Sequence, residues 1–351
     1  MMPEEWPIAA FAADQSAPPR AGGDRLSTVR IDFFLNPAER LSEQERALMT
    51  AMLHCLVSDI ADELRAALPN MATPANDEGN LALIELLSST GLLNRAGLFR
   101  LLLRRADEER IATGAKSRAG RREARVIQGL VSHGDGAIAA AAMTLIIARG
   151  RRRDRFGQCL LHFDDLPAQE AGALVCSLAA ALRLHLTATG GTAEADRQLS
   201  AAMAQVMARH DPGSSIEQLT ASLVRLLDEE NALSDELLAA AAMEGEMNFV
   251  AQALARRSGI GGDVALDELL SGDPKRVMTL LRMGRLARES AAALLAGIGD
   301  LIGIADPARA IGEFDRLSDA DVANALNWIS ADPLYQRAVA ALGGKNGQRT
   351  V

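Results

Sequence analysis

The chain has 351 residues, of which 48% are hydrophobic and 24% are charged, a balance typical of a folded protein rather than a disordered one. Only 3% are aromatic, and the good helix formers Ala, Leu and Arg are abundant, so an all-β fold is excluded. The formal net charge of −9 argues against a protein that coats nucleic acid, because such binding depends on many cationic contacts with phosphate.

The cysteines and the apolar runs bear on where the protein resides. Its three cysteines are too few and too irregularly spaced for a disulfide framework, which predicts a reducing compartment. Residues 1–20 open with acidic side chains and contain Pro18-Pro19, unlike a secretory signal peptide. The best apolar run, at 137–148, is about a dozen residues long, whereas a membrane span needs about 20. We therefore expect a soluble, cytoplasmic protein without a membrane span.

Both ends of the chain lack hydrophobic periodicity. Residues 1–26 are rich in Ala, Pro, Gly and Asp, and residues 343–351 begin with two glycines, so both segments are predicted to be flexible tails. Between them the pattern is helical almost throughout. We expect two domains, an N-terminal helical bundle at 27–160 and a second helical domain at 161–342.

The first helix carries the clearest signals. Ser42 and Glu45 form a capping box, in which each side chain satisfies a free backbone N–H. Apolar residues then recur every three or four positions up to Leu68, and Pro69 ends the helix. The same periodicity predicts further helices at about 80–90, 95–112, 118–131, 136–149 and 165–186.

From about residue 192 the predicted helices become shorter and more regular. An Asp-Pro pair, typical of the start of a helix, recurs at 211–212, 273–274, 306–307 and 332–333. The last three pairs each follow another helical stretch, and a helix pair at 235–254 has the same layout without the proline. The second helices of these units start 26 to 33 residues apart. Such units predict a HEAT-like α-solenoid of short helix pairs after the N-terminal bundle, and an all-α fold for the whole chain.

Two segments resemble a known family. The stretch Asn36–Leu68, which includes LSEQERALMTAMLHCLVSDIADELRAAL, is similar to the opening of a bacterial, mostly alphaproteobacterial family known only as domain of unknown function number 2336. The stretch LSDELLAAAAMEGEMNFVAQALARRSGI and its successors resemble the short helical repeats of that family. The resemblance implies an all-helical repeat protein. It brings no established activity and no functional residues.

None of the residue patterns that support catalysis or cofactor binding occurs in a suitable context. Gly297–Gly303 is spaced loosely like a dinucleotide loop, but such a loop must follow a strand, and this one follows a predicted helix. The grouped Cys and His residues are Cys159, His162, Cys176 and His185; the last two lie on opposite faces of one predicted helix and cannot converge on zinc. Cys176 is better interpreted as a small core residue. We therefore expect no cofactor, no metal and no enzymatic activity.

His54 supports a sharper hypothesis. It lies on the face of the first helix that carries Ser58, Asp62 and Arg65, away from the apolar stripe, so it is expected to be exposed. An exposed histidine on a long helix is typical of the phosphoacceptor of a signalling protein. Such a histidine is usually followed by an acidic residue, whereas Cys55 follows here, so a plain surface histidine is the favoured interpretation.

The charge distribution bears most on partners. Residues 95–155 hold 15 basic and six acidic residues, although the chain as a whole is acidic. The i,i+4 spacing predicts local pairs of Arg104 with Glu108 and of Arg105 with Glu109. The arginines that exceed their local acidic partners form either a solvated face, a contact with the acidic C-terminal array, or a site for an acidic protein. Among them, the candidate partner-binding residues are Arg118, Arg122, Arg125, Arg151, Arg152 and Arg153.

From these patterns we expect a non-enzymatic scaffold or regulatory adaptor that binds a protein partner through a helical-repeat surface. One alternative is a nucleic-acid-binding helical-repeat protein that uses the Arg-rich segment 95–155, which the overall negative charge disfavours. Another is a signalling protein with a phosphoacceptor at His54. The identity of the partner and the oligomeric state stay open at this point.

Overall fold

The computed structural model describes residues 42–68, 77–119, 126–189, 192–332, 334–336, 338–339 and 342. The tails predicted at 1–26 and 343–351 lie outside these residues. The described part of the chain contains fifteen α-helices, two short 3-10 helices and no strand, apart from one isolated β-bridge between Arg153 and Cys159. The predicted all-α fold class is confirmed.

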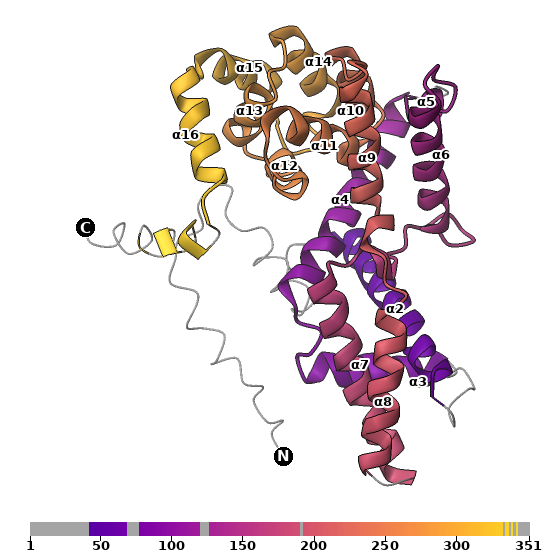
Figure 1. Cartoon of the computed structure of the whole chain (residues 1–351). Coiled ribbons are helices and arrows are strands. Elements are labelled where there is room, and N and C mark those ends of the chain that lie inside the picture. The colour runs from indigo at the N-terminus through magenta and orange to yellow at the C-terminus, as the bar shows by residue number, and fades with distance from the viewer. Residues whose placement is uncertain are drawn as a thin grey trace.

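The helices form two groups, seen in Figure 1 as a lower and an upper lobe. The lower lobe contains α2 (Glu43–Ala66), α3 (Asp77–Ser89), the first half of α4 (Ala96–Ala119), α7 (Ala168–Thr189) and α8 (Thr192–Met207). The upper lobe contains α5 (Val126–Leu130), α6 (Gly136–Arg151), α9 (Ile216–Glu229), α10 (Asp235–Met243), α11 (Met247–Ser258), α12 (Gly262–Leu269), α13 (Pro274–Met283), α14 (Arg288–Ile298), α15 (Pro307–Arg316) and α16 (Asp319–Ile329). The 3-10 helix η3 (Phe163–Asp165) precedes α7, and η4 (Pro212–Ser214) precedes α9.

α2 forms as its sequence predicts. Ser42 Oγ accepts a hydrogen bond from the backbone N–H of Glu45 at 3.2 Å, and the Ser42 N–H donates to the Glu45 carboxylate at 3.3 Å, which completes the capping box. The side chains of its apolar stripe, among them Met52, Leu56 and Ile60, are buried. Burial of this stripe against α4, α7 and α8 stabilises the helix more than its intrinsic propensity does.

Each lobe has its own hydrophobic core, and α4 contributes to both. Phe99 and Leu102 pack in the core of α2, α3, α7 and α8, whereas Ile111 packs in the core of α5, α6 and α9–α15. Helices α5 and α6 therefore pack with the C-terminal helices, and α7 and α8 pack with α2. The two cores therefore do not divide at residue 160, where we predicted the domain boundary. Hydrophobic periodicity shows which face of a helix is buried but not which helix covers it.

Three of the four predicted C-terminal helix pairs are present as α10–α11, α12–α13 and α14–α15, and the second helix of the fourth pair lies partly outside the described residues. The carboxylates of Asp273 and Asp306 cap α13 and α15, each with a proline in the first turn, as the Asp-Pro pattern predicts. Asp211 starts only the three-residue η4. Asp332 accepts a hydrogen bond from the Leu334 N–H at 2.7 Å, while Pro333 between them lies outside the described residues.

The pairs are arranged more compactly than in a regular stack. Helices α9, α11, α13 and α15 pack side by side in order, as successive repeats do. However, α10 packs directly on α14, so the first and third pairs touch without α12 between them. The HEAT-like solenoid is therefore not confirmed. The last helix, α16, contacts α13 at the edge of the upper lobe and has no fully buried residue (Figure 1).

Candidate protein-binding surface

The basic segment 95–155 is held largely by internal ion pairs. The guanidinium of Arg104 lies 3.0 Å from the carboxylate of Asp263 and 2.9 Å from that of Asp267, both on α12. The local pair of Arg104 with Glu108 predicted by i,i+4 spacing is not the one that forms. Carboxylates from a helix far along the chain come closer, and sequence spacing cannot reveal them.

Two further arginines bind the turns of the C-terminal helices. Arg118 Nη1 donates to Asp300 Oδ1 at 2.7 Å, and this pairing lowers the pKa of the Asp300 carboxyl. Arg149 Nη1 lies 2.7 Å from the Glu246 carboxylate. Of the three interpretations of the basic segment, contact with the acidic C-terminal array therefore holds for these residues. Arg118 remains half-exposed, but its charge is already paired.

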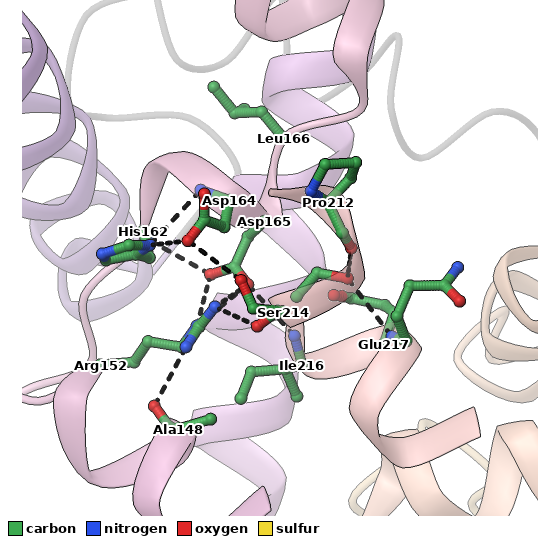
Figure 2. Close-up of polar contacts among 12 residues, drawn as sticks. Ala148, Arg152, His162, Asp164, Asp165, Leu166, Pro212, Ser214, Ile216 and Glu217 are labelled. Carbon is green, nitrogen blue, oxygen red and sulfur yellow. Dashed lines mark hydrogen bonds and ion pairs between the residues drawn. The ribbon is translucent and has the colours of Figure 1, made fainter. Parts of the chain in front are cut away.

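Arg152 is buried at the end of α6. Its Nε lies 2.9 Å from both carboxylate oxygens of Asp165, and its terminal nitrogens donate to the carbonyl oxygens of Ala148 and Ser214 at 3.1 and 3.0 Å (Figure 2). Its side chain is only 8% exposed. Arg152 is therefore a structural residue, which corrects the expectation that it contacts a partner.

Arg105 completes this buried cluster from α4. Its guanidinium lies 2.8 Å from the carboxylate of Glu217 on α9 and 3.7 Å from that of Asp165. Asp165 also accepts backbone hydrogen bonds from the residues that begin η3 and α9, at 3.1 and 3.2 Å (Figure 2). Burial alone would raise the pKa of Asp165, but the charges of Arg105 and Arg152 outweigh it and hold that pKa below its usual value. The cluster ties α4, α6, η3 and α9 together where the two cores meet.

The remaining predicted contact residues differ in whether the structure describes them and in whether a carboxylate already pairs with them. Arg122 and Arg125 lie outside the described residues. Arg153 lies 2.9 Å from the Glu109 carboxylate, so its charge is paired as well. Arg151 is exposed at the end of α6, and no carboxylate in the described part of the chain lies within ion-pair distance of it. Arg151 is thus the one predicted contact residue that the structure describes as both exposed and without an ionic partner.

The loop after α6 is a tight hairpin that presents Phe156. Two backbone hydrogen bonds, at 2.8 and 3.0 Å, close it, and the Asp154 carboxylate accepts hydrogen bonds from two backbone N–H groups at its tip, each at 2.8 Å. Phe156 is 74% exposed, more than any other large apolar side chain in the described residues. The guanidinium of Arg155 lies 4.7 Å from the centre of its ring. Arg155 is itself exposed and, like Arg151, has no carboxylate within ion-pair distance among the described residues.

The outward face of α6 is also apolar. The helix carries no charged residue before Arg149, and its exposed side chains include Met143 and Ile147, which are 43% and 49% exposed. α6 lies at the edge of the upper lobe, with the hairpin projecting from its lower end (Figure 1). None of the described helices has the length and apolarity required to cross a bilayer. We refer to Ala140, Met143, Ile147, Arg151, Arg155 and Phe156 as the α6 surface.

Sequence reasoning did not single out Met143, Ile147 or Phe156. The signal that could have found the first two is the apolar run at 137–148, because a helix without charge on any side has more apolar residues than one buried face uses. Phe156 lies in a short polar loop with no periodicity, so nothing in the sequence separates it from a buried phenylalanine.

The other candidate catalytic and metal-binding residues do not come together in one site. His54 is half-buried rather than exposed, and Arg65 on the same face is buried and bonds to Asn80 of α3 at 2.6 Å. Burial raises the pKa of the Cys159 thiol to about 11, which makes it a poor nucleophile. Cys176, expected in the core, is exposed. Within the described ranges, no group of three or more His, Cys, Asp or Glu side chains is placed to hold a metal ion.

The fold and the surface define an all-helical, two-lobed protein whose exposed features are an uncharged helix face and an aromatic hairpin. The chain belongs to the DUF2336 family, described as uncharacterised proteins conserved in bacteria, and the family's sequence model matches residues 117–326. This range runs from the end of α4 into α16 and contains the whole α6 surface, whereas the stretch 36–68 lies outside it. No curated protein and no solved structure matches the chain.

Proposed function

We propose that this protein is a non-enzymatic scaffold or regulatory adaptor of the bacterial cytoplasm that binds a protein partner through the α6 surface. The supporting observation is the exposure of Phe156 and Ile147 beside Arg151 and Arg155, which have no ionic partner among the described residues. Exposed apolar side chains bordered by charge are typical of protein-binding sites. The three free cysteines agree with a reducing compartment.

The hairpin lowers the entropic cost of using Phe156 as an anchor. Its backbone is already fixed by hydrogen bonds, so a partner does not have to order the loop. Truncation of an aromatic anchor that fills a pocket on a partner commonly costs about 2 kcal/mol or more of binding energy. Exposed ion pairs made by Arg151 and Arg155 contribute about 0.2–1 kcal/mol each, so they set orientation and association rate more than affinity.

The internal ion pairs argue against the alternative of a nucleic-acid-binding protein. Phosphate binding needs several free cations, and the described arginines of the segment 95–155 are mostly paired with carboxylates of the same chain. The half-buried position of His54 likewise gives no support to a phosphoacceptor. Neither alternative is favoured by a specific contact.

Affinity capture from the native host, with the whole chain as bait and identification by mass spectrometry, tests the proposal. The baits are the wild type, Phe156→Ala, Ile147→Glu and the matched control Leu81→Glu. Leu81 lies on α3 in the other lobe and is 47% exposed, against 49% for Ile147. We expect proteins that the wild type and Leu81→Glu capture and that both α6-surface variants lose. Equal capture by all four baits, with unchanged circular dichroism, contradicts the proposal.

A further inference from the structure

Three helices that pack side by side, α9, α11 and α13, end in the same way except for one side chain. After them the chain turns through Asn231, Gly259 and Arg285, whose φ angles are +55°, +75° and +55°. Glycine, and to a lesser degree asparagine, adopts this left-handed conformation readily, whereas an arginine is strained in it. Arg285 is the one described residue other than glycine and asparagine with a positive φ. Backbone strain of this kind is concentrated at functional sites, so it marks Arg285 as a candidate binding residue.

Arg285 lines a groove between α16 and the ends of α11 and α13. The volume of this groove is about 320 Å³. Pockets that hold ligands measure about 300–1,000 Å³, so the groove has room for one or two side chains of a partner. Its apolar lining includes Met283 at the end of α13 and Val322 and Leu326 on α16. The groove therefore has an apolar wall on α16 and charged side chains at the helix ends.

Arginines make up most of the charged lining. Arg257, at the end of α11, is already used inside the fold, because its guanidinium lies 2.5 Å from the Asp235 carboxylate and donates to the Leu233 carbonyl oxygen at 2.6 Å. Arg285 is exposed, and no carboxylate among the described residues lies within ion-pair distance of it. Its guanidinium is therefore free to pair with an anionic group that enters the groove.

Arg282 supplies a second guanidinium to the same groove. It lies over the ring of Phe314, 5.3 Å from the ring centre, which holds the side chain in place. Its hydrogen bonds to the Leu317 carbonyl oxygen and the Asp319 carboxylate, at 3.3 and 3.4 Å, are both made by Nη2. This leaves Nε and Nη1 without an acceptor in the described residues. The Asp319 side chain is fully exposed and can turn into solvent, so two guanidinium groups can face one ligand.

We propose that this groove binds an acidic peptide segment of another protein, in which a carboxylate stands beside an apolar side chain. The carboxylate pairs with Arg285 and Arg282, and the apolar side chain lies against Val322 and Leu326. Arginine suits such a ligand, because its planar guanidinium forms two parallel hydrogen bonds with a carboxylate. The apolar wall and the small number of free cations favour a peptide over nucleic acid, which requires many phosphate contacts.

The groove goes beyond the proposed function, because it is a second binding surface. It borders α16, at the edge of the upper lobe opposite α6 (Figure 1). Two partners can therefore occupy the groove and the α6 surface at the same time, as an adaptor requires. The inference does not depend on what the α6 surface binds.

Peptide selection on the whole chain tests the inference. The probe is a display library of random short peptides, and fluorescence anisotropy measures how tightly each enriched peptide binds. We expect the enriched peptides to carry Asp or Glu next to a large apolar residue. Because the contact is small, their dissociation constants should be in roughly the micromolar range. A library that yields no such peptide overturns the inference.

Arg285→Gly is the sharpest variant, because it removes the cation and also relieves the backbone strain. It should weaken peptide binding at least about threefold, while urea denaturation shows a protein at least as stable as the wild type. Arg285→Glu should weaken binding at least about tenfold, since like charges then meet. Arg209→Glu is the matched control, because Arg209 is exposed just after α8 and has no carboxylate within ion-pair distance in the described part of the chain. It should bind the peptides as the wild type does.

Leu326→Glu tests the apolar wall. Because α16 has no fully buried residue, the fold should stay intact while peptide binding weakens at least about tenfold. Leu81→Glu, in the other lobe, should have no effect. Peptides that bind Arg285→Glu and Leu326→Glu as tightly as the wild type, or that lose binding equally in both controls, overturn the inference. None of these variants touches the α6 surface, so the groove and the proposed function can fail separately.

Discussion

The guanidinium of Arg105 lies 2.8 Å from the carboxylate of Glu217, although 112 residues separate them in the chain. Arg105 is on α4, the helix that contributes to both cores, and Glu217 is in the first turn of α9. Both side chains are largely buried, at 4% and 15% exposed. Because neither charge can return to water without unfolding its surroundings, this pair should fix how the two lobes are joined.

Removal of one partner should therefore be costly. We expect Arg105→Met to lower the free energy of unfolding by about 3–5 kcal/mol, because it leaves Glu217 as a buried carboxylate without its cation and takes away one of the two cations near Asp165. Arg225→Met is the matched control, since the pair of Arg225 with Glu229 is about half exposed on both sides. It should cost no more than about 0.5 kcal/mol. Urea denaturation measures both, and equal losses would show that the buried cluster has no special role.

Asp165 should make the stability depend on pH. Its folded pKa lies below the usual value, so its contribution to stability is fully present above the pKa of the unfolded chain and is lost as the pH falls through the folded pKa. We expect the denaturation midpoint of the wild type to drop between about pH 5 and about pH 2. In Asp165→Asn the midpoint should start lower and fall less over the same interval. Parallel pH profiles for the two proteins would contradict this role.

The sequence predicts well what depends on neighbours in the chain. The capping box at Ser42 and the Asp-Pro starts at Asp273 and Asp306 are confirmed because the atoms involved lie within three residues of each other. Partners that come from distant helices leave no such trace. This is why the sequence could not predict the pairing of Arg105 with Glu217, nor that the two cores do not divide at residue 160.

The candidate surface was predictable only in part. Arg151 was found because an excess of positive charge over local acidic partners is visible in the sequence. The same excess also pointed to Arg152, which is buried, because the carboxylate that pairs with it lies 13 residues away. Phe156 could not be found, since exposure of a single loop residue depends on how the surrounding helices pack.

Gly245, in the turn between α10 and α11, should tolerate no side chain. Its φ of +79° is in the left-handed region, and an added Cβ would lie 2.7 Å from the Cα atom of Ala112 on α4. Gly259 is a matched control, because its φ is +75° but nothing lies within 4 Å of an added Cβ. We expect Gly259→Ala to cost about 1–2 kcal/mol from backbone strain alone. Gly245→Ala should cost about 1–3 kcal/mol more, since the turn must move away from α4. Similar costs in urea denaturation would show that this contact is not tight.

Titration with nucleic acid separates the proposed function from its main alternative. We expect duplex DNA and structured RNA to show no micromolar binding at physiological salt, because a chain of net charge −9 repels phosphate and most described arginines of the segment 95–155 are already paired. At low salt, weak binding that disappears as salt rises would be the ordinary response of a few exposed cations, such as Arg151 and Arg155. The test is run at two salt concentrations with the wild type and with Arg151→Glu combined with Arg155→Glu, which leaves the internal ion pairs intact. Micromolar or tighter binding at physiological salt that the double reversal abolishes would mean that the α6 surface recognises phosphate rather than protein.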